Sequence, residues 1–299
     1  MLRTRLLTAA VLIPLVLAVA ISGEPWMSIV VGVVAFLGMI ELISLLDAGG
    51  FEPPQVVGLG AGLMVSAAGL VTANRALIGG ALADLLDAAD PIGLTMLMLA
   101  AAAVVLAIAA FARPDPRTGF ISWATTVFGV AYLGILVPFV AVTGHLAPPG
   151  GSASTAVGAL GLRSGVAWSL LLLLVVWGYD SGAFIVGRWL GRRRLIDHVS
   201  PSKTVEGLIG GLLTATVAAG IGGALVGLDP WQPLVLGPLI GMAAQAGDLA
   251  ESLIKRAAGR KESGFLVPGH GGILDRIDSF LFAAPVLVGY AVLIAGSRL

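Results

Sequence analysis

The chain of 299 residues has 58% hydrophobic side chains and only 11% charged ones, whereas a soluble domain carries about 25% charged residues. Its mean hydropathy of +1.00 indicates a protein of the lipid bilayer. The balance of 17 basic and 17 acidic residues excludes a nucleic-acid-binding protein, which would carry a basic excess. Because cysteine is absent, a disulfide framework, a thiolate zinc site and a thiol nucleophile are excluded as well.

Apolar runs of the length that crosses a bilayer as a helix, about 20 residues, follow one another along the whole chain. They predict an all-α polytopic integral membrane protein with about nine transmembrane helices. The expected spans are 6–22, 26–46, 56–73, 92–112, 121–143, 165–187, 204–227, 233–254 and 278–297. An outer-membrane barrel is not expected, because these runs are apolar all round instead of alternating.

The first span allows a second interpretation. Arg3 and Arg5 precede an apolar run that ends in Ala18-Val19-Ala20, which is the pattern of a cleaved secretory signal. A retained helix is the simpler interpretation, because the second span follows after a very short turn.

Basic side chains gather in alternate connecting segments, and this predicts the orientation, since Lys and Arg accumulate on the cytoplasmic side. With a cytoplasmic N-terminus, 14 of the 17 basic residues lie in cytoplasmic segments and the C-terminus lies outside. The 14 residues are Arg3, Arg5, Arg113, Arg117, Arg188, Arg192, Arg193, Arg194, Lys203, Lys255, Arg256, Arg260, Lys261 and Arg276. Among them, the run 192–194 is best interpreted as a topology anchor that contacts anionic lipids.

The chain is expected to divide in function between residues 1–164 and 165–299. The first part holds helices one to five and is interpreted as a scaffold that faces lipid and provides dimer contacts. Glu41 is the one acid well inside a span there, and a structural role is favoured for it. The second part holds helices six to nine and the charged cytoplasmic loops, which we expect to be catalytic.

One polar stripe marks the cytoplasmic end of the eighth span. On a helix, Asp248, Glu251, Ser252 and Lys255 share a face, because their spacing is i, i+3, i+4 and i+7. Acids inside membrane helices are candidates for function, since burying a charge there costs roughly 2.5 to 3.5 kcal/mol. The alternative is a seam of salt bridges between helices.

A glycine-rich cationic loop follows at residues 259–279 and contains ValProGlyHisGlyGly at 267–272. Backbone N–H groups at such glycines can surround an anion, and His270 and Arg276 add positive charge. Asp275 and Asp278 then fall on one face of the next helix. Carboxylates beside a cationic glycine loop are typical of a Mg²⁺-phosphate site, although an Asp at a helix start can also be a simple cap.

The preceding cytoplasmic loop supplies a further cation. SerProSerLysThrValGluGly, residues 200–207, predicts a helix start with Ser200 as N-cap and Pro201 at the first helical position. Lys203 would then project from a first turn that already favours an anion. Upstream, Asp180 lies in the sixth span.

Residues 252–278 resemble the signature of the phosphatidate cytidylyltransferase family, also called CDP-diacylglycerol synthases. The pattern is Ser-x-apolar-LysArg, four residues, Lys-acid, then Pro-x-HisGlyGly-x-x-AspArg-x-Asp. Residues 180–183, 200–207 and 247–252 resemble the family elements Asp-x-Gly-Ala, SerPro-x-LysThr-x-GluGly and GlyAsp-x-x-GluSer, in the family's order. Two departures are Glu262, where the family has Asp, and Val267, where it has Leu, Ile or Phe.

The resemblance implies the reaction of CTP with phosphatidate to give CDP-diacylglycerol and pyrophosphate, with one or two Mg²⁺ ions as cofactor. With the residue chemistry, it predicts as catalytic residues Asp248, Asp275, Lys255, Arg276 and His270. The residues predicted to bind substrate phosphates are Ser200, Lys203, Thr204, Arg256, Gly271 and Gly272. The predicted metal ligands are Asp248, Asp275, Asp278 and Asp180.

The same resemblance implies an enzyme of phospholipid biosynthesis in the cell's inner (plasma) membrane, with its active site facing the cytoplasm and phosphatidate entering from that leaflet. It also suggests a homodimer, for which small residues such as Gly207, Gly211 and Gly220 permit close helix packing. Membrane lipids are expected partners and nucleic acid is not. The alternatives are a secondary transporter with a path of charged residues, and a CTP-dependent lipid or polyprenol kinase.

Overall fold

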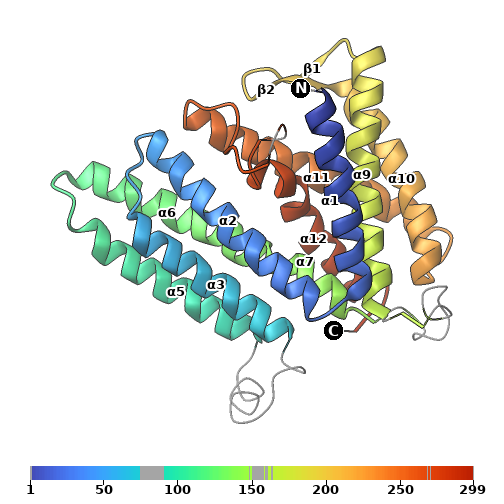
Figure 1. Cartoon of the computed structure of the whole chain (residues 1–299), viewed down its shortest axis with the longest axis horizontal. Helices are drawn as coiled ribbons and strands as arrows, with labels where there is room; N and C mark the ends of the chain where they lie inside the picture. Colours follow the sequence, from blue (N-terminus) through green and yellow to red (C-terminus); the bar gives the residue numbers. More distant parts are fainter. Residues whose placement is uncertain are drawn as a thin grey trace. The chain divides into compact units, whose positions relative to one another are not determined.

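The computed structural model describes residues 2–74, 91–147, 149, 158, 161–162, 164–267, 269 and 271–298. Helices dominate these segments (Figure 1). They are α1 (Leu2–Ser22), α2 (Trp26–Ala48), α3 (Gln55–Ala73), α5 (Pro91–Ala110), α6 (Pro116–Leu136), α7 (Pro138–Val142), the 3₁₀ helix η2 (Thr143–His145), α9 (Ser164–Leu190), α10 (Val205–Val226), α11 (Gln232–Ala257) and α12 (Leu274–Leu293). Each expected span therefore falls on a helix.

Seven helices in the described segments are long and apolar enough to cross a membrane. The apolar parts of α1 and α3 within the same segments, Leu7–Ser22 and Gln55–Val71, are shorter. Many large apolar side chains on the helices are exposed, as a lipid-facing surface requires; Leu97, Phe120 and Leu213 are examples. The chain is thus an all-α polytopic membrane protein, whereas nine crossings and the sides of the two termini remain predictions.

A small β-hairpin corrects the prediction for residues 200–207. Strand β1 (Arg194–Ile196) pairs antiparallel with β2 (Ser200–Thr204), so the segment from Ser200 is extended and not helical. The N-cap of α10 is Thr204, whose side chain accepts a hydrogen bond from the Gly207 N–H at 3.1 Å. Both strands of a two-stranded ribbon are edge strands, which tolerate a proline such as Pro201. Lys203 therefore projects from a strand and not from the first turn of a helix.

The C-terminal end of α11 and the N-terminal end of α12 differ from the expected spans. α11 continues to Ala257, so the predicted polar stripe from Asp248 to Lys255 lies on one continuous helix, as expected. α12 begins at Leu274, four residues before the expected span, because Asp275 and Arg276 belong to its first turn. Both Asp275 and Asp278 are helical residues.

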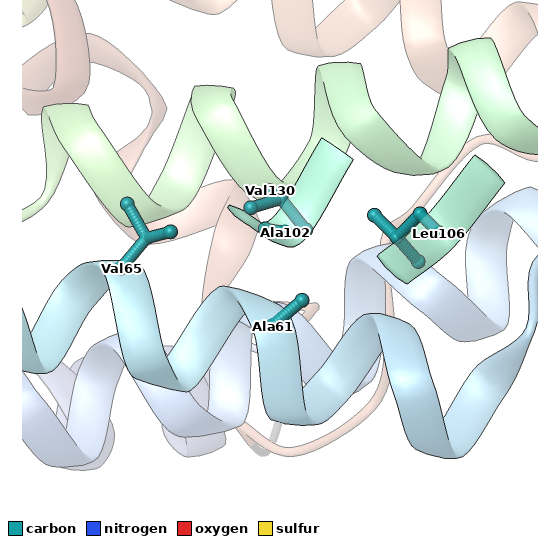
Figure 2. Packing of buried hydrophobic residues seen from close by; sticks show 5 residues of the cluster. All are labelled: Ala61, Val65, Ala102, Leu106 and Val130. Carbon is teal, nitrogen blue, oxygen red and sulfur yellow. The ribbon is translucent and has the colours of Figure 1, made fainter. Parts of the chain in front are cut away.

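The chain forms two compact units that alternate along the sequence: residues 1–9, 24–141 and 254–276 form the first, and residues 10–23, 142–253 and 277–299 form the second. In the first unit, α3, α5 and α6 pack around a buried apolar cluster (Figure 2). Its members are Ala61, Val65, Ala102, Leu106 and Val130. The expected functional division at residue 164 stays a prediction.

In the second unit, α9 and α10 pack closely side by side (Figure 1). A Cβ atom on Gly211 would lie 2.6 Å from the Tyr179 ring, and one on Gly207 would lie 2.9 Å from the Ala183 carbonyl oxygen. These two glycines therefore serve packing inside the chain. A Cβ atom on Gly220, in contrast, would meet no atom within 4 Å among the described residues.

Gly237 of α11 provides a test of this close packing. A Cβ there would lie 2.5 Å from the Thr216 Cα and 2.9 Å from the Ala215 carbonyl oxygen, and backbone cannot move aside as a side chain can. We expect Gly237→Ala to lower the free energy of unfolding by about 1–3 kcal/mol. Thermal unfolding in detergent micelles measures the loss. The matched change Gly220→Ala should leave stability equal or higher, because its methyl group meets no neighbour, and an equal loss in both variants would contradict the packing account.

Candidate active site

The first charged cluster joins the hairpin to α11 within the second unit. The Lys203 ammonium forms a hydrogen-bonded ion pair with the Asp248 Oδ2. The Ser252 hydroxyl lies 3.4 Å from the Asp248 Oδ1. The side chains of Lys203 and Asp248 are 20% and 29% exposed, so both charges stay accessible to a ligand. We call these three residues the Lys203 cluster.

The hairpin that presents Lys203 is held at both ends. Glu206, in the first turn of α10, accepts hydrogen bonds from the N–H groups of Arg192 at 2.9 Å and Arg193 at 3.2 Å. The Arg194 guanidinium donates to the Pro201 carbonyl oxygen across the ribbon. The position of the Lys203 backbone therefore depends on Glu206 as well as on strand pairing.

The backbones of α11 and α12 approach each other closely beside this cluster. A Cβ on Gly247 would overlap the Asp278 carbonyl oxygen, so α11 and α12 approach closely where Asp248 and Asp278 stand. Asp278 accepts a hydrogen bond from the Ser279 N–H at 2.7 Å. Asp180 is an exposed residue of α9. Its neighbour Tyr179 donates to the Gln245 Oε1 at 2.6 Å, which ties α9 to α11 one turn before Asp248.

The second charged cluster surrounds Asp275 within the first unit. Lys255 Nζ lies 2.6 Å from Asp275 Oδ1, and the two side chains are 11% and 8% exposed. The Asp275 Oδ2 accepts hydrogen bonds from the N–H of Ser263 at 3.0 Å, the Ser263 hydroxyl at 2.8 Å and the N–H of Gly272 at 2.9 Å. Asp275 is therefore a buried carboxylate with four donors.

Glu41 joins this second cluster from α2, although the sequence favoured a structural role for it. Its Oε2 accepts a hydrogen bond from the Leu274 N–H at 2.9 Å and lies 3.2 Å from the Ser263 hydroxyl oxygen. The sequence feature that could have indicated a part in the site is that Glu41 is a lone acid in an apolar span. Ser263 was missed because a serine in a polar loop carries no such signal. We call Glu41, Lys255, Ser263, Gly272 and Asp275 the Asp275 cluster.

The glycines of the cationic loop lie against carboxylates of the protein itself. Gly271 has φ +84°, and a Cβ there would lie 2.7 Å from the Asp275 Oδ2, so only glycine fits. A Cβ on Gly272 would overlap the Ser263 hydroxyl and the Glu41 carboxylate. Among the described residues, the Gly272 N–H donates to a carboxylate of the protein itself, Asp275. That Gly271 and Gly272 bind a substrate phosphate stays a prediction.

The other predicted site residues take varied places. Arg256 and Arg276 are exposed, and the Arg256 guanidinium donates to the Arg260 carbonyl oxygen at 3.1 Å. Ser200 is buried in β2, and Thr204 caps α10. His270 lies outside the described residues. Their roles in phosphate binding or catalysis stay predictions.

Mg²⁺ in proteins keeps one or two carboxylate ligands and takes the others from water and phosphate. In the part of the chain that the structure describes, no three His, Asp or Glu side chains group closely enough to hold a metal alone. Asp248 already carries a cation on its Oδ2, the Lys203 ammonium, and is partly exposed. Asp248 is therefore a candidate for one of the one or two carboxylate ligands that such an ion keeps, and a bound Mg²⁺ stays a prediction.

Comparison with known proteins gives a match over nearly the whole chain: residues 3–294 match the model of the cytidylyltransferase family. Three similar proteins bear the name phosphatidate cytidylyltransferase. The Synechocystis sp. protein is 44% identical over 133 residues, which are 44% of this chain and 45% of the relative. The Bacillus subtilis protein is 46% identical over 125 residues, 41% of this chain and 46% of the relative.

The Staphylococcus aureus protein is 35% identical over 173 residues, 57% of this chain and 60% of the relative. In each case the chain spans about half the length of the curated relative that it matches.

Proposed function

The chain belongs to the cytidylyltransferase family, and from this premise we propose that it transfers the cytidylyl group of CTP to phosphatidate, giving CDP-diacylglycerol and pyrophosphate. The observation that carries the proposal is the ion pair of Lys203 with Asp248. It joins two family-like motifs that stand 45 residues apart in the sequence. The Lys203 ammonium could bind a phosphate of the lipid or the nucleotide, and the partly exposed Asp248 carboxylate beside it could bind a metal ion that contacts the same phosphates.

In the proposed reaction, a phosphate oxygen of phosphatidate attacks the α-phosphorus of CTP, and pyrophosphate leaves with the electrons of the bond that breaks. The phosphatidate oxygen is already anionic, so a separate general base is not required. Lys203 and Lys255 would bind substrate phosphates as compact charges. Each now pairs with a carboxylate, and a polyanionic substrate competes for the same ammonium group.

For the metal, we propose Asp248 and Asp278 as ligands of Mg²⁺, with Asp275 and Asp180 as further candidates for one or two ions. When bound, Mg²⁺ neutralises phosphate charge and favours displacement at phosphorus. Among the candidates, Asp275 offers fewer open positions, because its Oδ2 already accepts three hydrogen bonds.

We also propose that the site faces the cytoplasm from the inner cell membrane, where CTP is available and phosphatidate enters from the leaflet. The count of basic residues supports this side, because the loops before β2 and after α11 are the most basic segments. A homodimer is part of the proposal. The dimer interface would not use the face of α10 that carries Gly207 and Gly211, because α9 covers that face.

The test is conversion of CTP labelled in the cytidine and in the γ-phosphate by the purified full chain in micelles that contain phosphatidate. We expect a cytidine-bearing lipid and free labelled pyrophosphate, and we expect EDTA to stop the reaction and excess Mg²⁺ to restore it. Release of labelled CDP with phosphate on a lipid would indicate a kinase instead. Absence of any nucleotide chemistry under these conditions would contradict the proposal and favour a transporter.

A further inference from the structure

We infer that Glu41, on α2 in the N-terminal part of the chain, is a positioning residue that fixes the loop around Asp275 for the reaction. The inference rests on the proposed function for its kinetic consequences. Its structural part concerns contacts within the first compact unit only. Residues 1–164 were expected to be scaffold, and Glu41 gives one of their helices a direct part in the site.

The first observation is a buried carboxylate on a membrane helix. Glu41 is 5% exposed, and neighbouring buried residues of α2 such as Leu42 and Leu45 are apolar. Burying a carboxylate is costly unless hydrogen bonds compensate. Its Oε1 is buried and has no hydrogen-bond partner among the described residues. An apolar side chain would fill this place at lower cost, and the compensation for the buried carboxylate comes from the donors that its Oε2 binds.

The second observation is which donors these are. The Leu274 N–H belongs to the first turn of α12, where backbone N–H groups lack partners within the helix. Leu274 immediately precedes Asp275. The Ser263 hydroxyl oxygen lies between the two carboxylates, 3.2 Å from the Glu41 Oε2 and 2.8 Å from the Asp275 Oδ2, and its single proton is shared between these two acceptors. One carboxylate therefore holds the residue before Asp275 and the serine that contacts it.

The third observation is the fit of the loop around Glu41. A Cβ on Gly264 would lie 2.5 Å from the Glu41 Oε1, and a Cβ on Gly272 would overlap the same carboxylate. Gly264 and Gly272 are eight residues apart in the sequence, and a side chain at either position would require the Glu41 carboxylate to move. The loop is thus folded onto Glu41, and the Gly272 N–H is directed to Asp275 at 2.9 Å.

These contacts define a chain of hydrogen bonds from α2 to the reacting region: Glu41, Ser263, then Asp275. Groups that orient a ligating or catalytic carboxylate typically change activity by about 10- to 100-fold when they are removed. Glu41 would act in this way and would not touch substrate. Removing the Glu41 carboxylate should therefore lower kcat and leave the KM for phosphatidate nearly unchanged.

The kinetic test compares Glu41→Ala, Glu41→Gln and the control Asp47→Asn, which removes an exposed acid from the same helix. We expect kcat to fall about 10- to 100-fold for Glu41→Ala. Glu41→Gln keeps an acceptor for Leu274 and Ser263 and should restore most of the loss, and Asp47→Asn should match the wild type. Equal kcat in wild type and Glu41→Ala, or equal losses for Ala and Gln, would overturn the inference.

A double-mutant cycle adds a second kinetic readout, because Glu41 and Ser263 act through one hydrogen-bond chain. Glu41→Ala combined with Ser263→Ala should lose little more kcat than the worse single variant, whereas independent roles would give multiplied losses. If Glu41→Ala does not fold, Glu41→Leu takes its place in the cycle, since it fills the same space without an acceptor for Leu274 and Ser263. Multiplied losses overturn the inference in either case.

Amide hydrogen exchange separates this inference from the proposed function, since it needs no turnover. We expect faster exchange of the Gly272 and Leu274 amides in Glu41→Ala than in wild type or Asp47→Asn, with the other amides of α2 and α12 unchanged. Unchanged exchange would overturn the positioning role even in an active enzyme. A wild type that forms no CDP-diacylglycerol would refute the proposed function, while the exchange result would still decide the part played by Glu41.

Discussion

Asp248→Asn is expected to lower the kcat for CDP-diacylglycerol formation by about 1000-fold while the protein remains folded. The change keeps the shape of the side chain and removes the charge that pairs with Lys203 and that we propose as a Mg²⁺ ligand. Asp248 and Lys203 are both partly exposed, so water can solvate the unpaired ammonium and stability should change little. The measurement is turnover of labelled CTP in micelles, with thermal unfolding of the same samples.

Asp197→Asn is the matched control, because Asp197 is an exposed acid in the turn that joins β1 to β2. It removes the same charge from the same hairpin region without changing a proposed ligand. Near-normal turnover by Asp248→Asn would refute the role of Asp248. A similar loss in Asp197→Asn would show that overall charge near the hairpin, and not the ion pair, governs activity.

Asp275→Ala is expected to abolish activity and also to destabilise the protein by about 3–5 kcal/mol. It removes the carboxylate that forms an ion pair with the Lys255 ammonium, on a side chain that is only 11% exposed. It also removes the acceptor of the Ser263 and Gly272 N–H groups. Thermal or denaturant unfolding in micelles measures the stability, and the CTP assay measures the activity.

The companion variant is Asp275→Ala combined with Lys255→Met. Because breaking a buried ion pair costs more than replacing both of its partners, the double variant should recover part of the stability and none of the activity. A double variant as unstable as Asp275→Ala alone would assign the loss to the backbone hydrogen bonds instead. The different expected stabilities of Asp248→Asn and Asp275→Ala follow from the different burial of the two ion pairs.

Several features of the site could be predicted because they depend on short stretches of sequence. The stripe from Asp248 to Lys255 follows from helical spacing alone, and the structure places both residues on α11. The sequence grouped Asp248 and Asp278 only as predicted ligands of the same metal ions, and the structure shows that α11 and α12 approach closely at these residues. The start of α10 was wrong by four residues at its cap, because Thr204 competes with Ser200 for the same role and β pairing with residues 194–196 decides between them.

Contacts between distant segments could not be predicted. Ser263 and Glu41 are 222 residues apart, and Glu41 and Leu274 are 233 apart. From the sequence alone, Glu41 could lie near the membrane surface, form an ion pair with a basic side chain, or belong to the active site. The partner that it finds depends on how α2 packs against the loop after α11, where a Cβ on Gly49 would lie 3.0 Å from the Ala258 Cα.

By itself, the sequence determined that this is a helical membrane protein, where its apolar spans lie and which polar residues the segments between them carry. These properties are local, since a run of about 20 apolar residues or a spacing of three and four acts without distant partners. Only the tertiary structure decided that Lys203 pairs with Asp248, that Lys255 pairs with Asp275, and that Glu41 holds the loop beside Asp275. Such pairs form where packed helices and loops bring buried charges within hydrogen-bond distance, and packing is a property of the whole fold.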